Sequence, residues 1–213
     1  AQGDFIFWLN HDTLVQPDCL QSMLQAMRAK PKVGAIAPKL WNERELLTPQ
    51  ANIASNFPTP WRCFLQDLLE ETPMINWPLA RKFLMSNFFP LTRTGPVRSL
   101  GGAAIFFRRE ALDEVGPMDE SYGMYYEETD WCYRLKLRGW QLYGVAEAQV
   151  VHFGGQTTRT RADFYSEMQR KSRLRYLQKF HPQLTRLLME RLLPALKKVK
   201  KSVGFRIAKT ENR

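Results

Sequence analysis

The feature that most constrains the fold is an uninterrupted apolar run near the start of the chain, which ends in a polar triplet. The run extends from Phe5 to Leu9, and Asn10-His11-Asp12 follows directly. Such a run, without polar alternation, is typical of a strand buried on both faces of a parallel sheet. After Pro17, apolar residues at helical spacing predict a helix with one buried face: Leu20, Met23, Leu24 and Met27. Strand, turn and helix in this order indicate an α/β fold.

Later segments repeat the alternation of strand and helix. The pattern predicts a strand over 33–37 that ends at Pro38, a strand over 103–107 with a short helix closed by Gly116, a helix over 128–138 stopped by Gly139, and strands over 141–145 and 149–152. These elements predict a mixed, mostly parallel sheet flanked by helices.

We expect a catalytic domain over residues 1–160 and a basic helical extension over 161–213. Within the domain, residues 41–100 hold many prolines and little periodicity, which predicts an irregular insertion with one helix around 63–71. The extension is interrupted at Pro182 and carries a leucine stripe beside basic residues.

The composition favours anionic partners and a reducing compartment. Lys and Arg number 31 against 21 Asp and Glu, which gives a net charge of +10. The cysteines Cys19, Cys63 and Cys132 have no spacing that indicates a disulfide framework or a zinc site. No apolar segment reaches the roughly 20 residues that a membrane-spanning helix needs, and the first residues do not resemble a signal peptide. We therefore expect a cytoplasmic protein.

Asp12 is the first candidate site residue because it follows a predicted strand at the sheet edge where α/β folds bind ligands. A carboxylate there can hold Mg²⁺ or Mn²⁺, which would bridge the oxygens of a diphosphate. The alternative is that Asp12 only caps a turn.

Three carboxylates crowd the start of the predicted helix at 128–138, namely Glu127, Glu128 and Asp130, beside Tyr126. Acids at this position stabilise the helix dipole, and that structural role is the alternative for each of them. A carboxylate at a cleft edge can also take a proton from an attacking hydroxyl. We place Glu127, Asp130, Tyr126 and Trp131 among the acceptor-binding candidates.

His152 ends a predicted strand and precedes Gly154-Gly155. Its imidazole can complete the coordination of a divalent ion, or it can be a structural histidine. Gly101-Gly102 precedes another strand, where the lack of side chains permits a ligand to approach the backbone, or simply allows a bend.

The ordered set of segments resembles the family-two inverting glycosyltransferases of GT-A fold, especially the rhamnosyltransferase-like members. The resemblance covers about residues 1–180, and the segments that carry it are Phe7 to Thr13, Gly34 to Lys39, Gly101 to Ala104, Arg108 to Leu112, Val115 to Glu120, Tyr125 to Asp130, Arg138 to Trp140 and Val150 to Gly155.

The resemblance implies that Asp12 is the metal-binding acid of a DxD-like motif and that His152 is a further ligand of the ion or diphosphate. Asn10 stands where many members have the first acid of that motif. Glu128 stands at the position of the catalytic base, where relatives often have Asp. The nucleotide-binding first half of the family's domain precedes none of these segments, so we expect the isolated chain to bind nucleotide-sugar poorly.

The function expected from these residues is transfer of a sugar, with inversion, from a nucleotide-diphosphate sugar to a hydroxyl of a glycan or lipid-linked acceptor, in synthesis of a surface polysaccharide. The basic C-terminus favours peripheral contact with an anionic membrane at its inner face, the alternative being a solvated helix packed on the domain. A metal-dependent nucleotidyl or phosphoryl transferase is one rival, although no P-loop is present. A non-catalytic membrane- or nucleic-acid-binding module is the other, and we do not expect nucleic acid as a partner.

Overall fold

A computed structural model describes residues 2–50, 54–70, 77–85, 88–154, 162–196 and 198. The chain divides into two compact units. The first consists of Ala1–Phe57 and Met85–Ser172, and the second of Pro58–Leu84 and Arg173–Arg213. The helices of the insertion and those of the C-terminal region thus share one unit, whereas the sequence suggested a single division after residue 160.

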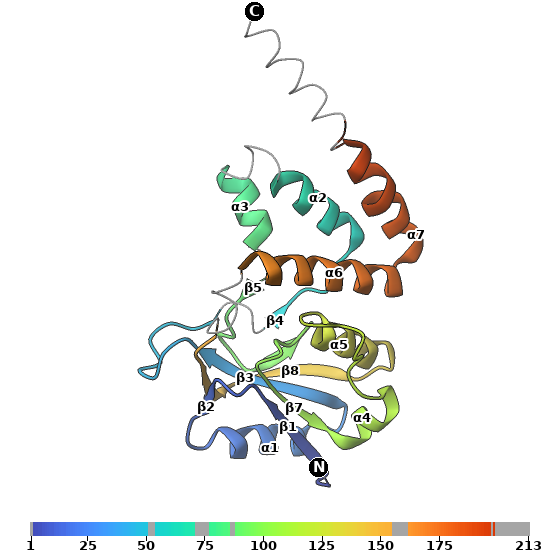
Figure 1. Ribbon diagram of the computed structural model, residues 1–213. Helices are drawn as coiled ribbons and strands as arrows, with labels where there is room; N and C mark the ends of the chain where they lie inside the picture. The colour runs from blue at the N-terminus through green and yellow to red at the C-terminus, as the bar shows by residue number, and fades with distance from the viewer. Residues whose placement is uncertain are drawn as a thin grey trace, which may run out of the picture. The chain divides into compact units, whose positions relative to one another are not determined.

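The first unit is built on a mixed sheet that contains β1 (Phe5–Leu9), β2 (Thr13–Val15), β3 (Val33–Trp41), β6 (Gly95–Val97), β7 (Ala104–Arg108) and β8 (Gln141–His152) (Figure 1). The order is β1-β7-β3-β8-β2, and β6 pairs with β8 as well. A separate pair is formed by β4 (Ala54–Ser55) and β5 (Phe88–Phe89). The predicted α/β class and mixed sheet are confirmed.

The prediction of a mostly parallel sheet is wrong. Of the described pairs in this sheet, only β3 with β8 is parallel, and the other pairs are antiparallel. The apolar runs reflect burial between layers, which does not depend on strand direction. β1 differs further, because among the described strands it pairs only with β7, and Trp8 is 45% exposed.

Two strand boundaries also differ from those predicted. β3 continues through Pro38 to Trp41, because the pairing with β8 shifts register between Pro38 and Lys39, where an irregular ladder tolerates a residue without an N–H. The two strands predicted over 141–145 and 149–152 are one strand, β8, and the same register shift lies between Val145 and Gln149.

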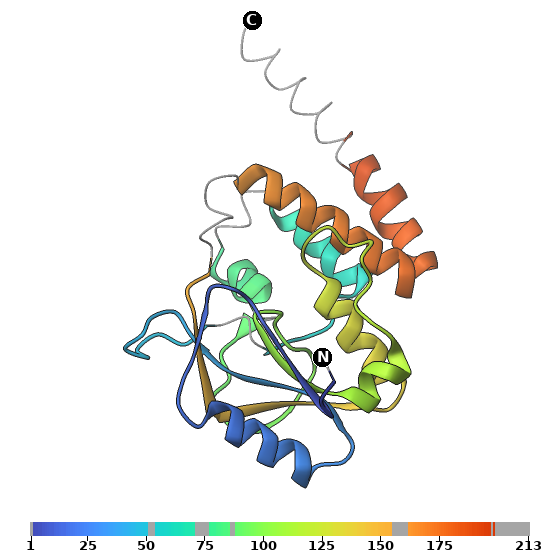
Figure 2. The ribbon, with the colours of Figure 1, turned by 60° about the horizontal axis from the view of Figure 1, so that its bottom comes forward.

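Helices cover both faces of this sheet. α1 (Cys19–Ala29) lies on one side, and α5 (Glu127–Leu137) lies on the other, near α4 (Arg109–Val115) (Figures 1 and 2). Met23 and Met27 of α1 are fully buried. On the α5 side, Trp131 packs against Phe107, with ring centroids 5.1 Å apart. The central strands are consequently buried on both faces, which fixes the sheet edge that carries the candidate site.

The second unit is helical. It contains α2 (Pro60–Glu70), α3 (Pro78–Met85, up to Leu84), the second half of α6 (Ala162–Phe180), α7 (Pro182–Thr185) and η3 (Arg186–Leu192), a π-helical segment. The insertion thus holds two helices rather than one. Phe64 of α2 packs with Leu188 and Leu193 in a small core. The basic tail beyond residue 198 lies outside the described residues. In the described part of the chain, no helix combines the length and the apolar character needed to cross a membrane.

Candidate active site

The turn that carries Asp12 is fixed by backbone and side-chain hydrogen bonds between β1 and β2. The Asn10 N–H donates to the carbonyl of Ala103, at 2.9 Å, and the Thr13 hydroxyl donates to the Asn10 carbonyl, at 2.6 Å. The Asp12 carbonyl accepts a hydrogen bond from the N–H of Phe153 at 3.0 Å. These bonds place the polar triplet at the edge of the sheet beside the end of β8.

Asp12 and His152 face each other at this edge. β2 pairs with β8 so that Thr13 lies opposite His152, and Asp12 Oδ1 is 3.4 Å from His152 Nε2. That oxygen is buried and has no hydrogen-bond partner. Burial lowers the pKa of His152 below its ordinary value, and the charge of Asp12 opposes this only in part. The imidazole is therefore largely neutral at pH 7.

A third residue, Gln50, completes this cluster and was not predicted from the sequence. Its Nε2 donates to the carbonyl of His152 at 2.7 Å, and its Oε1 is 3.0 Å from His152 Nδ1. Gln50 lies in a loop with no periodic pattern, 102 residues before His152. No sequence signal singles it out from the other residues of the insertion.

Glu128 lies in the first turn of α5. Before it, Tyr125 and Tyr126 both have positive φ, of 65° and 73°, a backbone conformation that a non-glycine residue adopts only at a cost of roughly 1 kcal/mol or more each. Burial raises the pKa of Glu128 to about 7, and the charge of Glu127 raises it further. Glu128 can therefore hold or release a proton near neutral pH, as a general base requires.

Short contacts connect the Asp12 turn with Glu128. Asn10 bonds to Ala103, and the preceding residue, Gly102, faces Glu128 so closely that a β-carbon on it would lie 3.4 Å from Glu128 Cγ. The end of β1, the start of β7 and the start of α5 thus meet at one edge of the first unit. The predicted proximity of an acid that holds a cation and an acid that acts as base is consistent with these contacts.

Asp130 and Trp131 have structural positions, and their prediction as acceptor-binding residues is wrong. Asp130 is 0% exposed and accepts hydrogen bonds from Arg134 Nε at 2.6 Å and from the Tyr122 hydroxyl at 3.2 Å. Trp131 is 1% exposed, and its indole N–H donates to the Gly116 carbonyl. Residues two apart on a helix point to nearly opposite sides, so Asp130 turns away from Glu128 into the protein.

The remaining candidates keep surfaces from which they could contact a ligand. Tyr126 and Glu127 are half-buried, and so are Gly101 and Gly102. Burial raises the pKa of Glu127 above its ordinary value. The predicted contacts of these residues with acceptor or donor stay predictions.

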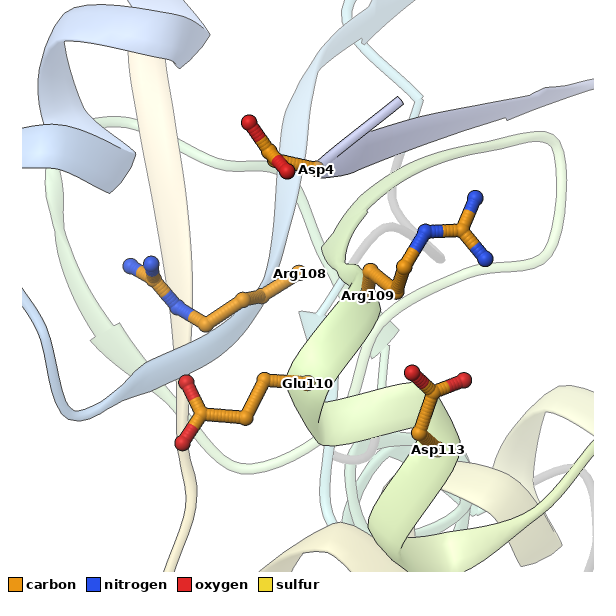
Figure 3. Close-up of a pocket in the computed structure, with 5 residues that line it drawn as sticks. All are labelled: Asp4, Arg108, Arg109, Glu110 and Asp113. Atoms are coloured by element: carbon orange, nitrogen blue, oxygen red, sulfur yellow. The ribbon is translucent and has the colours of Figure 1, made fainter. Parts of the chain in front are cut away.

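A pocket of a different kind lies at the opposite end of β1, where Asp4, Arg108, Arg109, Glu110 and Asp113 line it (Figure 3). Its residues are held by structural bonds: the Arg108 guanidinium donates to the Met27 carbonyl at the end of α1, and the Arg109 N–H donates to the Asp4 carbonyl. Asp4 precedes β1 and Asp12 follows it, so this pocket is separate from the candidate active site.

The donors at Asp12 and His152 fit a divalent cation in part. A carboxylate oxygen and a neutral imidazole nitrogen face each other, and both are suitable ligands for Mn²⁺. Within the described residues, no group of three or more His, Cys, Asp and Glu side chains could hold a metal ion. The protein would therefore supply two ligands and leave the other positions to water and to a diphosphate, which is the usual way Mg²⁺ is held.

Comparison with known proteins identifies the family. The family described as "Glycosyl transferase family group 2" matches residues 5–199. The chain therefore belongs to glycosyltransferase family group 2. This confirms the resemblance seen in the sequence, with the order of its segments as the evidence.

Two curated proteins are 29% identical to the chain over 156 residues, and both are named N-acetylglucosaminyl-diphospho-decaprenol L-rhamnosyltransferase. They come from Mycobacterium tuberculosis strains CDC 1551 / Oshkosh and ATCC 25618 / H37Rv. The match covers 73% of this chain and 48% of each relative, so the chain spans about half the length of the curated relatives it matches.

Two solved structures are similar at low identity. GalNAc-T7 with UDP, GalNAc and Mn²⁺ is 14% identical with a TM-score of 0.45, and the alignment covers 70% of this chain and 27% of that one. A197 from STIV is 11% identical with a TM-score of 0.41, covering 71% and 59%. Both TM-scores are below 0.5, and family membership rests on the sequence match.

Proposed function

We propose that the protein transfers a sugar from a nucleotide-diphosphate sugar to an acceptor hydroxyl, with inversion at the anomeric carbon. The observation that carries this proposal is Glu128, a half-buried carboxyl with a pKa of about 7, which faces Gly102 at the sheet edge that also bears Asp12 and His152. A single carboxylate beside the acceptor and a separate pair of cation ligands match the two charges that a direct displacement develops.

In this mechanism Glu128 accepts the proton of the acceptor hydroxyl while that oxygen attacks the anomeric carbon in line with the departing diphosphate. Asp12 and His152 would hold Mg²⁺ or Mn²⁺, which offsets the negative charge of the diphosphate when it is bound. Glu127 keeps negative charge beside Glu128 and so makes it a stronger base. A direct displacement by one nucleophile inverts the anomeric centre.

The names of the curated relatives suggest the first substrates to test. We propose L-rhamnose linked to a nucleoside diphosphate as donor, and N-acetylglucosamine linked through diphosphate to a polyprenol as acceptor, with a role in the synthesis of a cell-envelope polysaccharide. The support is a match of 29% identity over 73% of the chain.

The test is product analysis with the full native protein. We expect release of nucleoside diphosphate and a rhamnosylated acceptor whose anomeric configuration, read by NMR, is opposite to that of the donor. Glu128→Gln should lower kcat by at least about 100-fold with little change in donor binding. Glu167→Gln, an exposed change on α6, serves as the matched control. Retained configuration, or full activity in Glu128→Gln, would contradict the proposal.

The same assay separates the two rival functions. A nucleotidyl transferase would release pyrophosphate rather than nucleoside diphosphate. A binding module without catalysis would release neither, and its binding to an anionic polymer would weaken steeply with salt and would be the same in wild type and Glu128→Gln.

We also propose peripheral contact with the cytoplasmic face of an anionic membrane, through the second unit. Its exposed apolar side chains include Trp61 at 55%, Leu79 at 79% and Leu187 at 55%, and basic residues are interspersed among them in the sequence. Co-sedimentation with vesicles of phosphatidylglycerol and phosphatidylcholine should show binding that falls when Trp61 and Leu187 are changed to Ser. Equal binding to pure phosphatidylcholine vesicles would contradict the electrostatic part.

A further inference from the structure

The side chain of Gln50 makes two contacts with one residue, and both are with His152. Its Nε2 donates to the main-chain carbonyl of His152 at 2.7 Å, and its Oε1 lies 3.0 Å from Nδ1 of the ring. The side chain is therefore inserted between the backbone and the imidazole of the same histidine, on the side of the ring opposite Asp12.

The backbone around Gln50 is fixed, so this contact does not depend on a freely moving loop. The Gln50 N–H donates to the Leu40 carbonyl at 3.0 Å, and the Asn42 N–H donates to the Thr48 carbonyl at 3.0 Å. Trp41 also forms a β-bridge with Pro49. The loop thus returns to the end of β3, which pairs with β8 next to His152.

The carbonyl of His152 determines which way the Gln50 amide points. A backbone carbonyl only accepts hydrogen bonds, so the amide group 2.7 Å away from it must be the NH₂. If the amide were turned over, two oxygen acceptors would be in close contact. The amide oxygen therefore faces Nδ1, and this orientation is set by a group whose chemistry does not change.

The amide oxygen then determines the tautomer of His152. Because Oε1 can only accept, Nδ1 must carry the proton that joins them. A neutral imidazole has one N–H, so Nε2 is left with a free lone pair. That lone pair faces Asp12 Oδ1 at 3.4 Å, a buried oxygen that also lacks a hydrogen-bond partner.

Two acceptors directed at each other with no proton between them repel, and a cation between them removes the repulsion. We propose that Gln50 is a positioning residue, which holds His152 with Nδ1 protonated and Nε2 open so that Nε2 and Asp12 together bind a divalent cation. This inference rests on the proposed function, because it deepens the cation site assigned there to Asp12 and His152. Hydrogen-bonded groups behind a ligand histidine commonly affect metal affinity by about 10–100-fold.

The test reads the tautomer directly, in the metal-free 213-residue chain labelled with ¹⁵N-histidine. At pH 8 the His152 ring should show a pyrrole-like Nδ1 and a pyridine-like Nε2. In Gln50→Met, which has similar size and no acceptor, we expect the ring to shift towards the opposite tautomer, with Nε2–H donating to Asp12. Gln50→Glu retains the acceptor and should keep the wild-type tautomer.

The second readout is cation binding at the same residue. Mn²⁺ should broaden the His152 signals of the wild type at a concentration roughly 10–100-fold lower than in Gln50→Met. Gln66→Met, at an exposed glutamine of α2, is the matched control and should behave as wild type. Gln50→Glu supports the proposal even if Gln50→Met does not fold, because it must then keep both the tautomer and Mn²⁺ binding.

A wild-type ring protonated at Nε2 would overturn the proposal, and so would a folded Gln50→Met with unchanged tautomer and unchanged Mn²⁺ response. Neither readout depends on catalysis. If the tautomer and Mn²⁺ binding are as expected but no sugar is transferred, the proposed function fails while the role of Gln50 stands.

Discussion

Gly102 lies directly against the side chain of Glu128: a β-carbon on Gly102 would be 3.4 Å from Glu128 Cγ and 3.5 Å from Cδ. These are ordinary van der Waals distances, so the contact leaves room for one methyl group and no more. The carboxyl of Glu128 is thereby enclosed at the start of β7, and this burial is the main reason that its pKa is raised to about 7.

Gly102→Ala should therefore fold normally, whereas Gly102→Val should not be tolerated as well. The alanine methyl fits the space, and we expect a change in the free energy of unfolding of less than about 0.5 kcal/mol. The additional methyl groups of valine must displace Glu128, which should lower stability by about 1–3 kcal/mol and lower kcat as well. Urea denaturation and kinetics of both variants check this, and equal behaviour of Ala and Val would show that the contact is not tight.

The rate of sugar transfer should rise with pH through an apparent pKa near 7. Glu128 must be ionised to accept a proton, and burial keeps it protonated below that pH. The charge of Glu127 contributes to the raised pKa, so Glu127→Gln should move the acid limb of the kcat profile to lower pH. A profile that does not move, or one that falls as pH rises from 6 to 8, would argue against Glu128 as the base.

Much of the fold was predictable because burial between layers leaves a pattern in the sequence. The helices α1, α4 and α5, and the stop at Gly116, were recognised from apolar spacing and glycine. Strand direction was not, because a strand covered on both faces has the same apolar pattern in either direction. A strand boundary at Pro38 was wrong because the register shift at that point tolerates a proline inside β3.

The candidate site was predictable where a residue follows a strand or begins a helix. Asp12, His152 and Glu128 all have such positions. Gln50 could not be found, since its role depends on a contact across 102 residues and its loop has no regular pattern. Asp130 was misassigned because a carboxylate that completes a buried ion pair and one that faces a ligand look the same in a sequence.

Asp130→Asn should destabilise the first unit by about 3 kcal/mol, because it removes the charge that a buried arginine pair needs. Arg134 Nε is 2.6 Å from Asp130 Oδ1, and the same guanidinium donates to the Pro117 carbonyl at 2.8 Å, which limits the loss. Glu167→Gln removes one partner of an exposed helix pair with Arg170 and should give no measurable change. Thermal or urea unfolding compares the two variants, and similar stability would show that the buried pair contributes little.

The pH dependence of stability gives an independent measure of Glu128. Its pKa in the folded protein is about 7, against an ordinary value of 4.5, so the folded state holds a proton that the unfolded state releases. Stability is then fully present below about pH 4.5 and declines as pH rises through 7, by at most about 3 kcal/mol, and by less because the half-buried side chain still reaches solvent. Glu128→Gln cannot ionise, so it should lack this decline. The free energy of unfolding of wild type and Glu128→Gln should therefore diverge between pH 5 and pH 8, with the variant the more stable at pH 8. Parallel curves would mean that the carboxyl of Glu128 is not desolvated, and the basis for its role as the base would be lost.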